Sequence, residues 1–394
     1  MVKLEDKKVR HMFYWNSVKT HFLLNPKLPH DLKEAYFRLY QKSPQLSSHI
    51  WITSSGTSGK LKIVALSKEA LLHSAENVNA HLQSNASDVW ALALPEFHVG
   101  GLGILARAHA SGAQVKVFDR IDEGVVNWDP RRFVLFCDEE NVTLTSLVPT
   151  QIYDLVSHNL SCPANIRAVF VGGGALSELL YEKARSLGWP VLPTYGLTEC
   201  SSQVASASLS SLENEEFPFL EILPHLEVKK NEQGLLQFKS KSLLTGVSSL
   251  DYLGEVQFVD PKYQADDGIW FSSEDRGECD GKRLFLFGRE SDFIKISGES
   301  VDFAWLSRAF QAAKIQMRYT GDAALVSIPD ERKGFHIALA VNKFCYGDHE
   351  CLLDYLNQHV PPFAKAEEVY KVDEIPRTPM GKVLLEQLRS KILG

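Results

Sequence analysis

The sequence lacks the features that mark a secreted, membrane-spanning or nucleic-acid-binding chain. Residues 1–8 are charged and hold no apolar core segment, so we expect no secretory signal. No apolar run approaches the roughly 20 residues that a membrane span requires. The net charge is −7, without the basic excess that is typical of nucleic-acid binders.

Patterned cysteines, internal repeats and low-complexity tracts are missing too. The six cysteines form no CxxC pair, which favours reduced thiols in a cytoplasmic protein over a disulfide framework or a zinc site. What the chain does have is 394 residues with a 44% apolar fraction. That length and composition can fill more than one hydrophobic core, so two domains are expected.

Strand-like and helix-like segments alternate over the first half of the chain. In the segment 68–85, Leu71, Ala75, Val78 and Leu82 fall on one helical face. We predict further helices at 31–41 and 176–187, and strands at 50–53, 88–94, 166–171 and 190–193. This alternation predicts an α/β domain whose strands are covered by helices.

The pattern changes beyond about Gly234. Short strands are expected at 235–239, 254–259 and 283–287, which indicates a β-rich subdomain. After residue 288 we expect helices at 303–313, 350–359 and following Gly381, with strands at 323–328 and 337–341. The fold class is therefore predicted as α/β: a large N-terminal domain, residues 1–290, and a small α+β C-terminal domain, residues 291–394.

The segment Ser-Ser-Gly-Thr-Ser-Gly-Lys-Leu-Lys at residues 54–62 is rich in hydroxyls, glycines and lysines. Glycines let the backbone curl so that amide groups face an anion, while hydroxyls and a lysine add donors and charge. By composition alone, an ordinary surface loop is an equal alternative. It is not a Walker loop, because only two residues separate Gly56 from Gly59 and Leu61 follows Lys60.

This loop resembles the signature of the acyl-adenylate-forming superfamily, Ser/Thr-Ser/Thr-Gly-Ser/Thr-Thr-Gly-x-Pro-Lys. The usual proline is replaced by Leu61, and the fifth residue is a serine. The resemblance implies ATP as a substrate, with its phosphates held by Ser54, Thr57, Ser58, Gly59 and Lys62.

A second motif, Tyr-Gly-Leu-Thr-Glu, occupies residues 195–199. An aromatic ring can stack on a base, a hydroxyl can reach a phosphate, and a carboxylate can hold a magnesium ion. Taken singly, each residue would more often be structural. The motif resembles the superfamily's Tyr-Gly-x-Thr-Glu, which implies nucleotide contacts for Tyr195 and Gly196, catalytic roles for Thr198 and Glu199, and Mg²⁺ on Glu199.

Two further segments fit the same superfamily. Gly172, Gly173 and Gly174 match its glycine turn beside the adenine, although a tight strand–helix turn is an equally good description and both can hold. The block from residue 273 to 298 resembles Asp-x-Gly … Gly-Arg-x-x-Asp-x-Ile-Lys-x-x-Gly. By that resemblance Asp275 binds the ribose hydroxyls and Arg289 contacts the nucleotide.

The C-terminal motif Pro-Arg-Thr-Pro-Met-Gly-Lys, residues 376–382, resembles the family's Pro-x-Thr-x-x-Gly-Lys. The resemblance implies that Lys382 reaches the carboxylate and the α-phosphate during adenylation, that residues 291–394 form a mobile lid, and that coenzyme A is the co-substrate. Family members usually carry Asp or Lys at the hinge, where this chain has Ser291.

The acyl side resembles the o-succinylbenzoate–CoA ligases of menaquinone biosynthesis. The shared segments are Phe-His-x-x-Gly-Leu at residues 97–102, Leu-Gly-Trp-Pro-Val at 187–191 and Thr-Glu-Cys-Ser-Ser-Gln at 198–203. The resemblance places five residues near the acid: His98, Gly100, Gly101, Ser202 and Gln203. A satisfied core histidine at a strand end is the alternative for His98, and no basic partner for a second carboxylate is evident.

We therefore expect an ATP-dependent o-succinylbenzoate–CoA ligase that forms acyl-AMP and pyrophosphate, then the thioester and AMP. A CoA ligase for another aryl or short-chain acid, and a degenerate homologue that only binds nucleotide or acyl-adenylate, are the alternatives. Typical family members carry a far longer segment before the phosphate loop, so the opening subdomain is expected to be shortened. The remaining N-terminal stretch is expected to cap the exposed sheet, and the loss to favour a homodimer.

Overall fold

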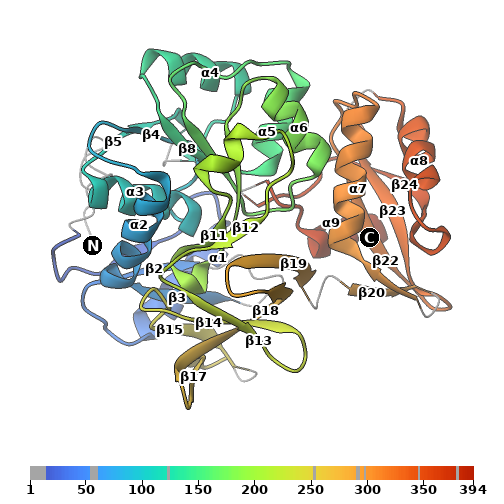
Figure 1. Cartoon of the computed structure of the whole chain (residues 1–394). Coiled ribbons are helices and arrows are strands. Elements are labelled where there is room, and N and C mark those ends of the chain that lie inside the picture. The colour runs from blue at the N-terminus through green and yellow to red at the C-terminus, as the bar shows by residue number, and fades with distance from the viewer. Residues whose placement is uncertain are drawn as a thin grey trace.

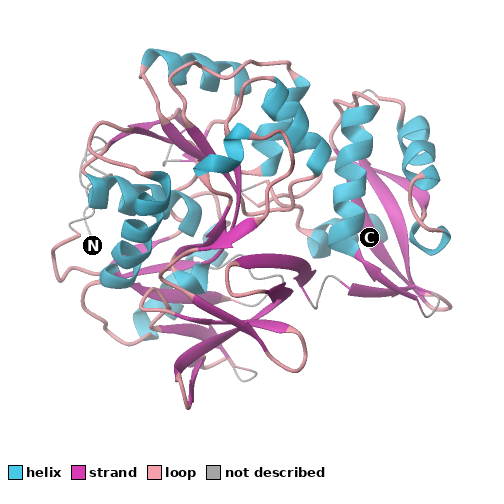
Figure 2. Cartoon of the chain, viewed as in Figure 1, coloured by secondary structure: helices cyan, strands magenta, loops and turns pink. Residues whose placement is uncertain are grey.

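A computed structural model describes residues 15–53, 61–121, 125–251, 254–289, 293–296, 299–344, 347–378 and 381–394. Two β-sheets and their covering helices form the larger part of the molecule, and a third sheet with its own helices lies to one side (Figure 1). The predicted α/β fold class is confirmed in this arrangement of strands and helices (Figure 2).

Five neighbouring strands of the 12-stranded main sheet are parallel and carry helices on both faces. These strands run in the order β10 (Val191–Leu197), β9 (Ala168–Val171), β8 (Leu144–Leu147), β4 (Val89–Leu92) and β5 (Gln114–Val117). One face is covered by α4 (Pro130–Glu139), α5 (Pro149–Ser157) and α6 (Glu178–Ser186), the other by α2 (Lys68–Leu82) and α3 (Val99–Ser111).

Strand β9 shows why the sequence produces this sandwich. Successive side chains of a strand point to opposite faces. Ala168 and Phe170 enter the core beneath α2 and α3, whereas Val169 and Val171 enter the core beneath α4, α5 and α6. A strand that is apolar at every position is therefore buried on both sides.

The remaining seven strands of the main sheet are antiparallel and form the predicted β-rich region. It comprises β11 (Ser202–Ser206), β12 (Leu220–Ile222), β19 (Arg283–Arg289), β18 (Gly268–Cys279), β14 (Leu235–Lys239) and β13 (Glu227–Lys230), with β17 (Lys262–Ala265) on β18. The remaining short elements are β6 (Arg120–Ile121), β7 (Val125–Val126) and the 3-10 turns Thr198–Cys200, Leu209–Glu213 and Pro362–Ala364.

The second sheet has the order β1 (His21–Leu23), β2 (His49–Thr53), β3 (Lys62–Ser67), β15 (Gly246–Leu250) and β16 (Val256–Val259). Helix α1 (His30–Lys42) packs on it, with Leu39 buried against Trp51 and Ile63. The expectation that the N-terminal stretch covers this sheet is confirmed for α1. The buried Lys68 also ties down the chain before β1, because its ammonium donates to the Ser17 carbonyl at 2.9 Å.

Residues 293–394 build their own sheet and cores. The sheet order is β21 (Glu299–Asp302), β20 (Phe293–Ile296), β23 (Gly334–Asn342) and β22 (Ala323–Asp330), with β24 (Ala366–Val372) on β23. Helices α7 (Phe303–Gln316), α8 (His349–Gln358) and α9 (Leu385–Leu393) pack against it. The expected boundary at residues 290–292, with Ser291, lies outside the described residues.

Most predicted elements are found with ends shifted by a few residues, but three helices, α3, α4 and α5, were not predicted. Helix α2 ends at Leu82, three residues early, because Gln83 adopts the left-handed conformation (φ 53°). Helix α3 was missed because Gly100, Gly101 and Gly103 are weak helix formers. No helix in the described part of the chain is long and apolar enough to span a membrane.

Candidate active site

The site is built where strands of the main sheet end, beginning with a three-residue network. The Tyr195 hydroxyl donates to Oδ2 of Asp275 at 2.6 Å, and Nε of Arg289 donates to Oδ1 of the same carboxylate at 2.9 Å. Asp275 is buried, and Tyr195 has its pKa raised well above the usual value by burial and by the Asp275 charge. Both carboxylate oxygens are thus oriented by donors from β10 and β19, and the phenol stays protonated.

Glu199 lies in the single 3-10 turn that follows β10, where Thr198 begins the turn. The Lys62 ammonium lies 3.0 Å from Oε1 of Glu199. This ion pair joins the first residue of β3, where the phosphate loop ends, to the second motif. The two charged groups that the sequence assigned to phosphate and to magnesium therefore meet in the folded chain.

The backbone around the second motif leaves no room for a side chain at Gly196. A Cβ there would lie 2.1 Å from the Ser202 carbonyl oxygen, at a β-bulge between β10 and β11. Ser201 (φ 58°) and Ser202 (φ 108°) have positive φ, which non-glycine residues adopt at a cost. The close approach brings the Glu199 turn back onto β11.

The three predicted glycines follow β9 directly. A Cβ on Gly172 would lie 2.9 Å from both Cγ2 and the carbonyl oxygen of Thr194, and Gly173 has φ 76°. A Cβ on Gly174 would meet Pro149, at the start of α5, at an ordinary 3.5 Å. The tight-turn description is therefore confirmed, and the turn lies beside the ends of β8 and β10.

The turn that carries Lys382 lies against the same edge of the sheet. A Cβ on Gly381 would be 2.4 Å from Oγ1 of Thr150, the second residue of α5. The turn is closed by a 2.7 Å bond from the Thr378 amide to the Lys382 carbonyl and a 3.1 Å bond from the Lys382 amide to Oγ1 of Thr378. Lys382 is exposed and follows Gly381, whose contact with Thr150 places the turn beside the start of α5.

On the acyl side, His98 caps α3 rather than ending a strand. Its Nε2 is buried without a hydrogen-bond partner among the described residues, and burial lowers its pKa to about 4. A neutral imidazole with an unsatisfied ring nitrogen can donate to or accept from a ligand. Gly100 and Gly101 form the first turn of the helix, and a Cβ on Gly101 would lie 2.2 Å from the Pro95 carbonyl oxygen.

Arg107 of α3 is the residue that sequence reasoning missed. Its guanidinium donates to Gln203, to the Gly103 carbonyl at 2.9 Å and to Ser146 at 3.4 Å, and it lies 4.8 Å above the Trp90 ring. Arg107 is buried, which lowers its pKa to about 9, and its hydrogen-bond partners among the described residues are neutral.

A buried guanidinium without an acidic partner is costly unless a ligand compensates it. Three of its five N–H groups are bonded within the described chain, so donor capacity remains. Gln203 is buried beside it, and Ser202 precedes Gln203 on β11. The signal that could have revealed Arg107 in the sequence is a single arginine within the apolar and glycine-rich run 99–108.

The predicted residues that the structure describes lie on a few elements of the N-terminal part and on the Lys382 turn. Tyr195, Asp275 and Arg289 share one hydrogen-bonded network, while Gly196, Thr198, Glu199 and Lys62 lie in or beside the turn that follows β10. His98, Gly100 and Gly101 lie at the start of α3, Ser202 and Gln203 lie on β11, and Gly172, Gly173 and Gly174 follow β9. Ser54, Thr57, Ser58 and Gly59 lie outside the described residues.

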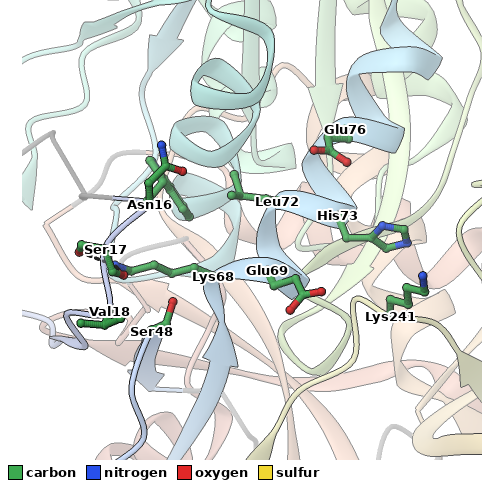
Figure 3. Close-up of a pocket in the computed structure, with 11 residues that line it drawn as sticks. Asn16, Ser17, Val18, Ser48, Lys68, Glu69, Leu72, His73, Glu76 and Lys241 are labelled. Carbon is green, nitrogen blue, oxygen red and sulfur yellow. Dashed lines mark hydrogen bonds between the residues drawn. The ribbon is translucent and has the colours of Figure 1, made fainter.

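A pocket of about 450 Å³ lies elsewhere, between α2 and the segment before β1 (Figure 3). Lys68 extends across it toward Ser17, with His73 and Lys241 on the far side (Figure 3). None of the predicted site residues lines it. Its buried lysine is explained by the bond that anchors the N-terminal segment.

Comparison with known proteins gives the family. A family model described as "AMP-binding enzyme" matches residues 25–229, more than half of the chain. The 2-succinylbenzoate–CoA ligase of Lactococcus lactis is 25% identical over 342 residues, covering 86% of this chain and 70% of the relative. The ligase of the same name from a Geobacillus strain is 28% identical over 348 residues, covering 86% and 68%.

Solved structures share the fold. The o-succinylbenzoate CoA synthetase (MenE) of Bacillus subtilis, in complex with the acyl-adenylate intermediate OSB-AMP, has a TM-score of 0.68 at 23% identity and covers 86% of this chain and 68% of its own. A single-residue variant of Escherichia coli MenE with bound OSB-AMS has a TM-score of 0.69 at 22% identity, covering 93% and 80%. By the family model and this shared fold, the chain belongs to the family of AMP-binding enzymes.

Proposed function

We propose that this chain is an ATP-dependent 2-succinylbenzoate–CoA ligase. As an AMP-binding enzyme it has the fold to adenylate an acid, and its similarity to ligases of that name supports the substrate. The observation that carries the choice of acid is the buried Arg107, which lies beside Gln203 without an acidic partner in the described chain. A dicarboxylate can place one carboxylate there while the other reacts.

In the first step, an oxygen of the acid's free carboxylate attacks the α-phosphorus of ATP. The bond from phosphorus to the bridging oxygen breaks, and pyrophosphate leaves with its electron pair. Lys382 is proposed to stabilise the negative charge that gathers between the two anions. Its closed turn against Thr150, at the sheet edge beside Gly174, supports this role.

The nucleotide is proposed to bind along the ends of β9, β10 and β18. Asp275 would accept from the ribose hydroxyls, with its oxygens oriented by Tyr195 and Arg289. The glycine turn would leave room for the adenine. Ser54, Thr57, Ser58, Gly59 and Lys62 remain our prediction for the phosphates.

Magnesium fits the donor at Glu199. The side chain offers carboxylate oxygens, which Mg²⁺ prefers, and no group of three or more metal-ligating side chains exists among the described residues. Magnesium is commonly held by one or two carboxylates together with substrate phosphates and water, which this arrangement allows. Bound there, the ion would neutralise charge on the phosphates, while Lys62 keeps Glu199 oriented.

In the second step, the thiol sulfur of coenzyme A attacks the acyl carbon of the acyl-AMP. The carbon–sulfur bond forms, the bond from carbon to the phosphate oxygen breaks, and AMP leaves; the thiol proton passes to solvent. We propose that residues 291–394 act as the mobile domain that reorients between the steps. Their separate sheet and cores support a body able to move as a unit.

We further propose that the enzyme works in the cytoplasm, where ATP and coenzyme A are available. The free cysteines of the described chain are compatible with a reducing compartment. A homodimer is also proposed, and exposed aromatic side chains such as Phe219 and Phe287 offer apolar surface for it.

The function is tested by measuring pyrophosphate release and thioester formation with a panel of carboxylic acids. 2-Succinylbenzoate should exceed benzoate, malonate and medium-chain fatty acids in kcat/KM, and Lys382→Ala should lose pyrophosphate release at least about 100-fold. If another acid of the panel is turned over equally well, the proposal of 2-succinylbenzoate as the substrate is rejected. ATP binding without AMP formation would instead identify a binding protein.

A further inference from the structure

The C-terminal part meets the N-terminal part at α6, which lies beside α7 (Figure 1), and at Tyr153 of α5. The Tyr153 hydroxyl donates to the backbone carbonyl of Tyr319, just beyond α7. The Lys314 ammonium lies 4.7 Å from the centre of the Tyr153 ring and 5.7 Å from that of Tyr319. One tyrosine therefore makes both a hydrogen bond and a cation–π contact across the junction.

The next residue of α5 adds charge to the junction. Oδ2 of Asp154 accepts a 2.9 Å bond from the Trp128 indole, which fixes the carboxylate in place. Burial raises the pKa of Asp154, and the charges of Lys314 and Arg377 oppose that rise. The carboxylate is thus held within the N-terminal part, next to Tyr153 in the chain.

The same region of the structure also contacts the turn that carries Lys382. Arg377 donates to the Gly381 carbonyl at 3.0 Å and to Oδ1 of Asp322 at 2.7 Å, so it is held within the C-terminal part. Gly381 packs on Thr150, three residues before Tyr153 on the same helix. The Tyr153 contact with the C-terminal part and the Gly381 contact with Thr150 therefore lie about one turn apart on α5.

The chemistry of the junction suits a contact that forms and breaks. Ile315 is one of few apolar side chains that enter the N-terminal core from α7, and Gln311 caps the Ser177 amide at 3.1 Å. Polar and charged groups can be satisfied by water after separation, whereas a wide apolar junction could not open cheaply.

We infer that Tyr153 and Lys314 form a latch that holds the C-terminal part with its Gly381 turn on Thr150. They are positioning residues for adenylation and act through Lys382. The inference rests on the proposed function, because its consequence is a difference between the two half-reactions. Weakening the latch lowers the fraction of molecules that are ready for adenylation, and leaves the thioester step unaffected.

The test measures each half-reaction separately in Tyr153→Phe, Lys314→Met and the double variant. ATP–pyrophosphate exchange with 2-succinylbenzoate should fall about fivefold to tenfold in each single variant, with KM for ATP unchanged. Thioester formation from preformed 2-succinylbenzoyl-AMP and coenzyme A should keep the wild-type rate. Tyr370→Phe and Lys333→Met are matched controls within the C-terminal part, since those side chains bond Glu368 and Glu367 instead.

A parallel fall in both half-reactions, or no change in either, overturns the latch. If wild-type protein shows no exchange with this acid, the proposed function fails and the latch is judged by amide hydrogen exchange. Peptides covering 172–180 include the Ser177 amide that Gln311 protects. They should exchange faster in the double variant than in the controls, and equal exchange overturns the latch independently of the substrate.

Discussion

The ammonium of Lys62 lies 3.0 Å from Oε1 of Glu199, and both side chains are less than half exposed. The two residues come from segments that the sequence assigned to different parts of one reaction centre. Lys62 begins β3, and Glu199 lies in the turn after β10. When nucleotide and magnesium bind, Lys62 can exchange the Glu199 carboxylate for a phosphate group. Glu199 can likewise exchange the Lys62 ammonium for the magnesium ion.

Replacing Glu199 tests this exchange. Glu199→Gln should lower the adenylation rate about 100-fold, because an amide supplies no charge to a magnesium ion. Glu199→Asp should recover part of the rate and shift the Mg²⁺ concentration that gives half-maximal activity upward. The measurement is pyrophosphate release over a titration of Mg²⁺. If Glu199→Gln keeps wild-type kinetics, Glu199 does not hold the metal ion.

Arg107 should set the preference for a dicarboxylate. Arg107→Met keeps an apolar stem against Trp90 and removes the charge. The loss of charged hydrogen bonds should lower kcat/KM for 2-succinylbenzoate about 30-fold to 100-fold. The value for a monocarboxylate analogue lacking the unreactive carboxylate should change far less. Equal losses on the two acids would assign Arg107 to the protein core, and the unfolding midpoint in urea shows whether the variant is folded.

Gly196→Ala should destabilise the protein through a steric clash. The added Cβ would lie 2.1 Å from the Ser202 carbonyl, so the bulge between β10 and β11 must shift. We expect a loss of about 2–4 kcal/mol in the free energy of unfolding, measured by urea denaturation. Gly174→Ala is the matched control: its Cβ meets Pro149 at 3.5 Å, and the expected change stays below about 1 kcal/mol.

Three partly buried histidines should make stability fall in mild acid. Burial lowers the pKa of His21, His98 and His225 to about 4, below the ordinary value of 6.5. The unfolded chain therefore binds more protons between these values, so the stability present above about pH 6.5 is lost as the pH falls toward 4.

The measurement is the urea midpoint at pH 7.5, 6.0 and 5.0. His225→Leu should show a smaller loss of stability on acidification than the wild type, because one titrating group has been removed. His30→Leu, at an exposed position, controls for the loss of an imidazole. If His225→Leu and the wild type lose stability in parallel, the acid sensitivity arises elsewhere.

The sequence by itself predicted the motif residues, most of the α-helices and several buried strands of the first half of the chain. Runs that are apolar at every position, such as 168–171, predicted buried strands because a two-sided sheet requires them. The helix over Leu71, Ala75, Val78 and Leu82 followed from its period. The motifs around Tyr195, Asp275 and Lys382 could be recognised because each is contiguous in the chain.

Only the tertiary structure decided which of these groups meet. The Tyr195 hydroxyl and Asp275 are 80 residues apart in sequence, and strand order brought them together. Helix α3 formed despite its glycines, because close packing of Gly101 on Pro95 outweighed a weak local preference. Arg107 was identified as a site residue only because it is buried without an acidic partner in the described chain. Burial is a property of the fold, and no local sequence pattern encodes it.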